Sequence, residues 1–262
     1  MLFRELLTAS LILLTSSAVA DNLITIDQVT SGNSNSTTVA VEGSGNTVDY
    51  SFGGANNTVN IDQEGNNAYV GYTTVWGSGA SWGGDLDGDY NDIDIYQLCN
   101  QTPCGGDRFE FHIAGNSNTV DFYQGYTVTT GGYYSADSVE YGGHFVQLDI
   151  HGSDNILLGS QRANNSGHEH SMTVGIYGSN NDVYVRQDSN QDKTMNLTIN
   201  NSYNDIDMAQ TGNASHSATV SISGSYSTDL DLLQQGGTAQ TYSLTQSCAT
   251  VGGCSVTVTQ GN

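Results

Sequence analysis

The chain has little proline, few basic residues and few cysteines. Of its 262 residues, one is proline, five are lysine or arginine and four are cysteine. So few basic side chains cannot neutralise a run of phosphates, which excludes a nucleic-acid-binding protein. The 27 acidic residues give a formal net charge of -22, so the surface repels other polyanions.

Apolar residues (36%) and charged residues (12%) are both scarce. An ordinary helical or α/β enzyme would contain more leucine, alanine, lysine and glutamate. The chain instead has 32 glycines and 25 asparagines. Its 15 tyrosines, with many valines and isoleucines in alternating positions, argue against disorder. The composition therefore predicts β-structure rich in turns.

Long apolar runs are also missing, except for one at the start of the chain. Leu6–Leu14 is almost wholly apolar, and Ala18-Val19-Ala20 has the small-x-small pattern of a signal-peptidase site. The run is too short to span a bilayer. Residues 1–20 are therefore predicted to be a signal peptide. We expect a secreted protein, outside the cell or on its surface, whose mature domain is 21–262.

The four cysteines form two close pairs, Cys99 with Cys104 and Cys248 with Cys254. In an exported chain, such pairs are usually disulfides. A metal site would need Cys-x2-Cys spacing or nearby histidines, and neither is present. We predict two local disulfides.

Asparagine and glutamine recur six positions apart, and this repeat determines the predicted fold. Seven pairs keep the spacing: Asn22/Gln28, Asn57/Gln63, Asn91/Gln97, Asn118/Gln124, Asn155/Gln161, Asn181/Gln187 and Asn204/Gln210. Three later segments keep only the glutamine, as Gln234, Gln246 and Gln260. The residues two and four positions after the asparagine are mostly apolar. Because every second residue of a strand points to the same face, both amides and the two apolar side chains share one face.

A second type of strand alternates with the first. Examples are Phe109–Gly115, Val146–Gly152, Met172–Gly178 and Ala218–Gly224, most of which lead through a Gly-Ser-x-Asn type of turn into the next Asn-to-Gln strand. Glycine and asparagine suit such corners because both tolerate positive φ. Two strands and two turns make one rung, and a rung this short must stack on its neighbours to bury its apolar face.

We therefore predict an all-β fold, a β-solenoid of about eight rungs forming a rod on the order of 40 Å long. Stacking places asparagine over asparagine and glutamine over glutamine, so the amides form hydrogen-bonded ladders. Two insertions, about 71–90 and 125–143, interrupt the regular repeat of the strands.

At these repeats the chain resembles the curlin family, the subunits of bacterial curli fibres. Asn57–Gln63 with Gly65 and Asn66, and Asn204–Gln210 with Gly212 and Asn213, are most similar to the strand-turn-strand repeat of that family. The resemblance implies a subunit of an extracellular amyloid-like fibre with roles in adhesion and biofilm. It also implies a nucleator subunit and an outer-membrane secretion pore as partners, with a host or matrix surface as a further one.

The insertions contain aromatic residues, namely Trp76, Trp82, Tyr126, Tyr133, Tyr134 and Tyr141. Exposed rings of this kind stack on sugars or on a neighbouring subunit. The alternative, which we favour, is that they cover an open side of the core.

Two clusters are candidates for metal binding, and both are weak. Asp85, Asp87, Asp89 and Asp92 concentrate carboxylates as a calcium loop would, but a solvated acidic turn is the favoured alternative because the order is not that of an EF-hand. His168 and His170 offer two imidazoles without a third ligand, and an exposed turn is favoured there.

No nucleophile motif or basic cluster indicates catalysis, so we expect a non-enzymatic protein without a cofactor. The sequence favours polymerisation, because the first and last strands lack the Pro or Lys that block sheet edges. The competing hypothesis is a monomeric secreted solenoid that binds a polysaccharide, ice or another surface ligand, or that cleaves an acidic glycan.

Overall fold

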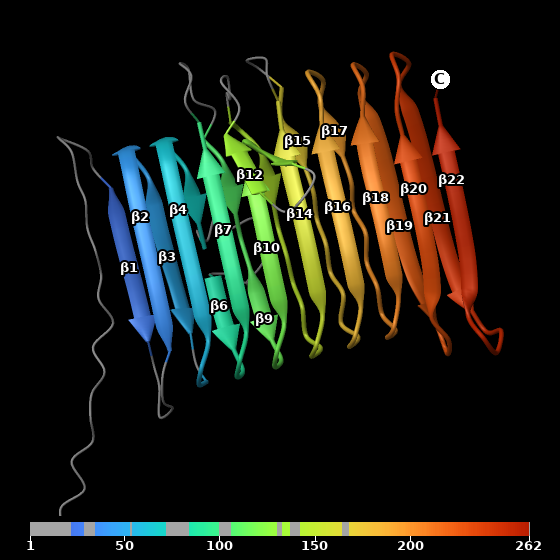
Figure 1. Ribbon diagram of the computed structural model, residues 1–262, viewed down its shortest axis with the longest axis horizontal. Helices are drawn as coiled ribbons and strands as arrows, with labels where there is room; N and C mark the ends of the chain where they lie inside the picture. The colour runs from blue at the N-terminus through green and yellow to red at the C-terminus, as the bar shows by residue number, and fades with distance from the viewer. Residues whose placement is uncertain are drawn as a thin grey trace, which may run out of the picture.

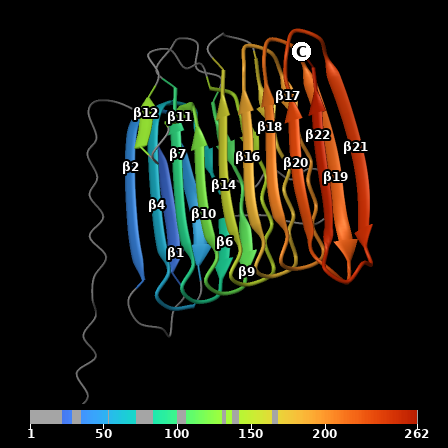
Figure 2. The ribbon, with the colours of Figure 1, turned by 45° about the vertical axis from the view of Figure 1, so that its right-hand side comes forward.

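The computed structural model describes residues 22–28, 35–52, 54–71, 84–99, 106–129, 133–136, 142–163 and 168–261, and these contain strands and turns but no helix. The chain alternates between two parallel sheets that face each other (Figures 1 and 2). We name them sheet A and sheet B. The predicted all-β solenoid is confirmed, with about eight turns between the first and the ninth strand of sheet B.

Sheet B contains the regular strands. Its nine members follow one another in chain order, each parallel to the next. They are β2 (Ser36–Ser44), β4 (Thr58–Asn66), β7 (Asp92–Leu98), β10 (Thr119–Gln124), β14 (Ile156–Arg162), β16 (Asp182–Asp188), β18 (Asp205–Thr211), β20 (Thr228–Gln234) and β22 (Cys254–Gln260).

Sheet A contains 11 strands, because two of its rungs are each split into two short strands. They are β1 (Leu23–Gln28), β3 (Thr47–Phe52), β5 (Tyr69–Val70), β6 (Gly84–Asp87), β8 (Arg108–Phe109), β9 (His112–Ala114), β13 (Phe145–Val146), β15 (His170–Ser171), β17 (Lys193–Thr194), β19 (His216–Gly224) and β21 (Gln240–Cys248).

The apolar core fills the space between the sheets. Each inward position is a column of stacked residues. In sheet B, for example, Val59, Ile93 and Val120 lie in register and are at most 1% exposed. Sheet A contributes Phe109, Val146 and Met172, all fully buried. Because no rung could bury these side chains alone, stacking supplies most of the core.

The second strand type is shorter than predicted. The predicted strand 109–115 is split into β8 and β9, β13 shares only Val146 with the predicted 146–152, and the predicted 172–178 contains no strand because β15 ends at Ser171. The rung of β17 is likewise reduced to a strand of two residues, although the inward side chains of these rungs remain buried. Gly175 has a φ of 124° and Leu197 a φ of 29°, so the backbone leaves the extended region within these rungs. β19 alone keeps the predicted strand in full, since it includes residues 218–224.

The first insertion is narrower than predicted. Gly84–Asp87 lies inside the predicted range, yet it forms β6 and pairs with β3 and β9 in sheet A. The second insertion contains an antiparallel hairpin of β11 (Tyr126–Thr129) and β12 (Tyr133–Ala136). Trp76, Trp82 and Tyr141 lie outside the described residues, as does the predicted signal peptide.

Candidate functional site

Stacked asparagines form a continuous column where sheet A turns into sheet B. Asn91 Oδ1 accepts hydrogen bonds from both the backbone N–H (2.9 Å) and the Nδ2 (3.1 Å) of Asn118 in the next rung. Asn91 Nδ2 donates to Gly115 O at 2.8 Å, which fixes the next turn. The same pattern repeats through Asn155, Asn181 and Asn204. Each asparagine therefore joins its corner to the corner of the following rung.

Stacked glutamines form a second column, on the inward face near the C-terminal end of each sheet-B strand from β4 to β22. Every Nε2 donates to the Oε1 of the next rung: Gln63 to Gln97 (2.7 Å), Gln97 to Gln124 (2.8 Å), Gln124 to Gln161 (3.2 Å), Gln161 to Gln187 (2.7 Å), Gln187 to Gln210 (2.8 Å), Gln210 to Gln234 (2.7 Å) and Gln234 to Gln260 (2.7 Å). All but Gln260 are fully buried. All side-chain hydrogen bonds of this ladder therefore point in the same direction along the rod.

The glutamines also connect the two sheets. The second N–H of Gln187 donates to Ser171 O in sheet A at 3.0 Å, and that of Gln210 donates to Thr194 O at 2.9 Å. The same bond reaches the long strands β19 and β21, where Gln234 donates to Ser217 O at 3.1 Å and Gln260 to Thr241 O at 3.2 Å. The glutamine column therefore ties sheet B to sheet A whatever the length of the sheet-A strand.

The glutamine ladder begins at Gln63 because the preceding rung has a different residue. Val41 is the register partner of Gln63 in β2. Gln63 Oε1 is consequently buried without a hydrogen-bond partner among the described residues. Such a group costs about 1–3 kcal/mol.

Three of the residues predicted for the ladders do not belong to them. Asn22 and Gln28 delimit a strand of sheet A, where Gln28 is the register partner of Phe52. Gln246 also lies in sheet A and pairs with Ile222. The prediction was wrong because the six-residue spacing does not distinguish the two sheets. Asn22 nevertheless stacks on an asparagine of the next sheet-A rung, because its Oδ1 accepts the backbone N–H of Asn46 at 2.9 Å and its Nδ2 donates to Gly43 O at 3.1 Å.

A column of ionisable side chains lies at the start of the sheet-A strands, and sequence reasoning missed it. Five consecutive rungs place Asp107, His144, His170, Lys193 and His216 in register, each at most 2% exposed. The rings of His144 and His170 stack at 4.8 Å. The residues differ in type and in spacing along the chain, so no motif indicated the column.

Burial shifts the pKa values of these side chains in the direction that favours the neutral form, upward for the acid and downward for the bases. The pKa of Asp107 rises to about 7 because of burial, which outweighs the hydrogen bonds from the backbone of His144 and Gly143. Burial lowers the pKa of His144, and lowers that of His170 to about 4. Burial also lowers the pKa of Lys193 to about 8, while its Nζ donates to the carbonyls of Gly212 and Ala214.

The predicted exposed turn at the histidine pair is wrong for one of its members. His170 is fully buried, and its Nε2 lies 2.7 Å from Arg162 O. His168 lies at the surface with its Nδ1 3.1 Å from Asp192 Oδ1. The two rings therefore do not share a metal site.

The disulfide between Cys248 and Cys254 is present and closes the last turn. Cys99 is also disulfide-bonded, and its predicted partner Cys104 lies outside the described residues.

The outward face of sheet B is acidic. Of the four calcium candidates only Asp92 lies in sheet B, whereas Asp85 and Asp87 lie in β6 of sheet A and Asp89 in the turn that follows it. The side chain of Asp85 lies outside those that the structure describes. Asp87 and Asp92 are exposed, whereas Asp89 Oδ1 accepts the backbone N–H of Ala55 and so fixes a turn. The side chains described here do not bring these carboxylates together as a ligand group. Crowding by Asp92 and Asp121 and, above all, burial raise the pKa of Asp94 to about 6.

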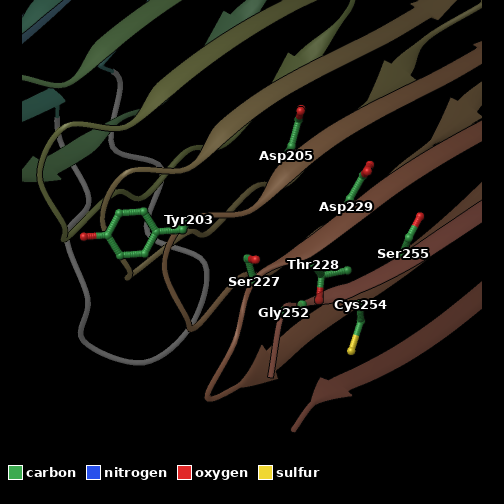
Figure 3. A pocket seen from close by; sticks show the side chains of 9 residues that line it. Tyr203, Asp205, Ser227, Thr228, Asp229, Gly252, Cys254 and Ser255 are labelled. Carbon is green, nitrogen blue, oxygen red and sulfur yellow. The ribbon is translucent and has the colours of Figure 1, made fainter. Parts of the chain in front are cut away.

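A shallow hollow of about 270 Å³ lies beside the last turns. Figure 3 shows Asp205, Asp229 and Ser255 following one another on β18, β20 and β22. The asparagine column ends here, because Thr228 and Cys254 occupy its next two positions. The hollow is open and acidic, which suits a hydrated cation better than an apolar ligand.

The two ends of the solenoid expose the interior of the fold. In β21 and β22 the inward side chains are only half-buried, whereas those of β20 are buried. Tyr242, Leu244, Val256 and Val258 pack against the core on one side only. At the other end Ile24 and Val41 have the same environment.

The described residues include no helix that is long and apolar enough to cross a membrane. Searches of family models, curated proteins and solved structures find no match to this chain.

Proposed function

We propose that the chain is a structural subunit that polymerises end to end into an extracellular amyloid-like fibre. The edges of β21 and β22 at one end, and of β1 and β2 at the other, pair with no further strand among the described residues. Such edges present rows of unpaired N–H and C=O groups to a second copy. The two ends also offer half-buried apolar side chains to one another.

The observation that carries the proposal is a match between the two terminal rungs. Gln28 in β1 and Gln246 in β21 occupy the first and last positions of one register column of sheet A. Between them the column contains Phe52, Leu86, Ile113, Ile150, Ile176, Ile199 and Ile222. The only two glutamines of this apolar column thus stand at its opposite ends.

A further copy that continues the same register places its β1 on β21 and its β2 on β22. Gln28 then stacks on Gln246 and Asn22 on Gln240, while Ile24 meets Tyr242. The amides can pair as they do along the ladder of sheet B, and the apolar groups lose their contact with water. At alternate positions along β1 and β21, polar residues meet polar ones and apolar residues meet apolar ones, which favours one register over its slipped alternatives. Along β2 and β22, Val39 meets Val258, whereas Val41 meets Gln260, so the glutamine ladder does not continue across the junction.

Fibre growth should depend steeply on salt and pH. Each unit carries a formal charge of -22, so units repel one another over a Debye length of about 30 Å at 0.01 M salt, but only about 3 Å at 1 M. Strand pairing acts at contact and is hardly screened. Seeded thioflavin fluorescence, with electron microscopy of each end point, should show growth that accelerates with NaCl and as the pH falls toward 4.

A charge placed on one end tests where the growth occurs. Val258→Lys puts an ammonium on the inward face of β22, which end-to-end stacking would bury, and should slow seeded growth roughly tenfold or more. Thr257→Lys adds the same charge to the outward face of the same strand and should leave growth within about twofold.

Equal growth of the two variants would contradict assembly through this end. A chain that stays monomeric at every salt concentration and pH would overturn the proposal and favour the monomeric binding solenoid.

We also propose that the chain is exported through its N-terminal signal and serves adhesion and biofilm. The resemblance to curlins supports this, and with it a nucleator, a secretion pore and a matrix or host surface as partners. The disulfide of the last turn is consistent with an oxidising compartment.

A further inference from the structure

Outside the ladders and the terminal rungs, the outward face of sheet A carries a group of metal-binding side chains. It consists of His112 in β9 with Asp149 and His151 in the next rung, and one ligand atom from each lies within 4.8 Å of the others. Of the side chains that the structure describes, no other three or more His, Cys, Asp or Glu residues converge in this way.

The backbone fixes the positions of these three residues. The pairing of Phe145 with Arg108 places Asp149 in register with His112 on the adjacent strand. His151 follows Asp149 by two residues and so shares its face of the sheet. The rings of His112 and His151 are 5.1 Å apart. The site therefore joins two successive rungs of the solenoid.

Asp149 is held in place by the third rung. Tyr177 OH donates to Asp149 Oδ2 at 3.2 Å, and the Tyr177 ring lies 5.1 Å from that of His151. Outer contacts of this kind orient a metal-binding carboxylate.

The other carboxylate oxygen points to a missing ligand. Asp149 Oδ1 is buried and has no hydrogen-bond partner, although His151 Nε2 lies only 2.6 Å away. The two atoms are thus close without the alignment of a hydrogen bond. A cation bound to both atoms would supply the buried oxygen with the partner that it lacks as a hydrogen-bond acceptor.

We propose that His112, Asp149 and His151 bind a divalent transition metal such as zinc, with water completing the coordination. Two imidazoles and one carboxylate are a ligand set that suits such ions, whereas calcium prefers oxygen ligands alone. Bonds of about 2.0–2.2 Å in a tetrahedral site put the ligand atoms about 3.3 Å apart. Small side-chain rotations reach this arrangement, since the His151 side chain is 40% exposed.

The charge of the protein assists the binding. The acidic surface concentrates divalent cations near the rod.

Isothermal titration of the full chain with Zn²⁺ at pH 7.5 tests the proposal. We expect one ion per chain, and a loss of affinity of at least about tenfold in His112→Gln and in Asp149→Asn. Tyr177→Phe should weaken binding less. Titration with Co²⁺ adds a visible absorption band that reports the ligands, and circular dichroism shows whether each variant is folded.

His168→Gln is the matched control. His168 also lies near the surface against a carboxylate, with its Nδ1 3.1 Å from Asp192 Oδ1, but no third ligand joins it among the residues that the structure describes. The control should bind Zn²⁺ as the unaltered chain does. The proposal is overturned if the unaltered chain binds no stoichiometric Zn²⁺, or if His168→Gln weakens binding as much as His112→Gln.

Discussion

The two corners of the central rungs follow different rules. From sheet A to sheet B, the same spacing separates the last inward residue from the asparagine in Leu86–Asn91, Ile113–Asn118, Ile150–Asn155, Ile176–Asn181 and Ile199–Asn204. Where the asparagine column has ended, this spacing is longer, in Ile222–Thr228 and Gln246–Cys254. From sheet B back to sheet A the spacing varies widely, as in Gln63–Ala68, Gln97–Asp107, Gln124–His144 and Gln161–His170.

The hydrogen bonds explain the difference. Asparagine side chains bond directly to the turn of the neighbouring rung, so a longer turn would move the groups that they bind. Glutamine side chains bond to one another and to sheet A inside the core. The loop that follows a glutamine can therefore lengthen without disturbing the ladder. Accordingly, the hairpin of β11 and β12 lies at this second corner.

Insertions at the two ends of β16 test this contrast most strongly. Ser-Gly-Ser inserted between Ser179 and Asn180 should break the asparagine column and lower the free energy of unfolding by roughly 3 kcal/mol or more, since several buried bonds are lost. The same tripeptide between Asn190 and Gln191 should cost less than about 1 kcal/mol, because loop entropy grows slowly with length. Urea unfolding measures both. Equal losses would contradict the assignment of different roles to the two corners.

The column of ionisable side chains lies directly after the corner of variable length, and His170 belongs to it. The effect of His170→Gln on the free energy of unfolding should therefore depend on pH. The folded-state pKa of His170 is about 4, below its usual value of 6.5, so the unfolded chain binds more protons between these pH values. This histidine therefore stabilises the fold less and less as the pH falls from 6.5 to 4, by up to about 3 kcal/mol.

The variant lacks this loss, so its stability relative to the unaltered chain should rise on acidification. Urea unfolding at pH 7, 5.5 and 4 checks the trend. Parallel pH curves for the two proteins would show that His170 is not buried in its neutral form.

Gln187→Ala tests the glutamine column itself. The substitution removes the bonds of Gln187 to Gln210 and Ser171, together with the bond that it accepts from Gln161. We expect a loss of about 1–3 kcal/mol. Tyr184→Ala, on the outward face of the same strand, should cost under about 1 kcal/mol. Thermal unfolding that shows equal losses would refute the inward role of the glutamine.

The smallest expected effect is on the acidic face. The raised pKa of Asp94, about 6, means that the folded state binds more protons than the unfolded state between pH 4 and 6. The stability contributed at this site therefore falls as the pH rises through that window. Asp94→Asn should be more stable than the unaltered chain at pH 7, by under about 1 kcal/mol because the site is half-exposed. The advantage should vanish at pH 4, and a constant difference would argue against a raised pKa of Asp94.

The sequence was sufficient to predict the solenoid, since a repeat of identical residues at fixed spacing indicates stacking. Gln187 and Asn181 could be placed because each has the same residue above and below. Gln28 and Gln246 could not, because a strand with the right spacing fits either sheet. The ionisable column and the His112–Asp149–His151 group were missed, since register, not local sequence, brings their members together.

The most direct measurement of end-to-end growth is a disulfide formed between two copies. Head-to-tail stacking puts position 28 of one copy beside position 246 of the next at about 4.8 Å, which is within reach of a disulfide. Within one copy the two positions lie at opposite ends of the rod (Figure 1). Fibres grown from a mixture of Gln28→Cys and Gln246→Cys chains are oxidised and run on non-reducing gels. We predict cross-linked pairs from the mixture and none from either variant alone, whereas fibres that yield no pairs, or equal pairs with Ile26→Cys in place of Gln28→Cys, would contradict the account.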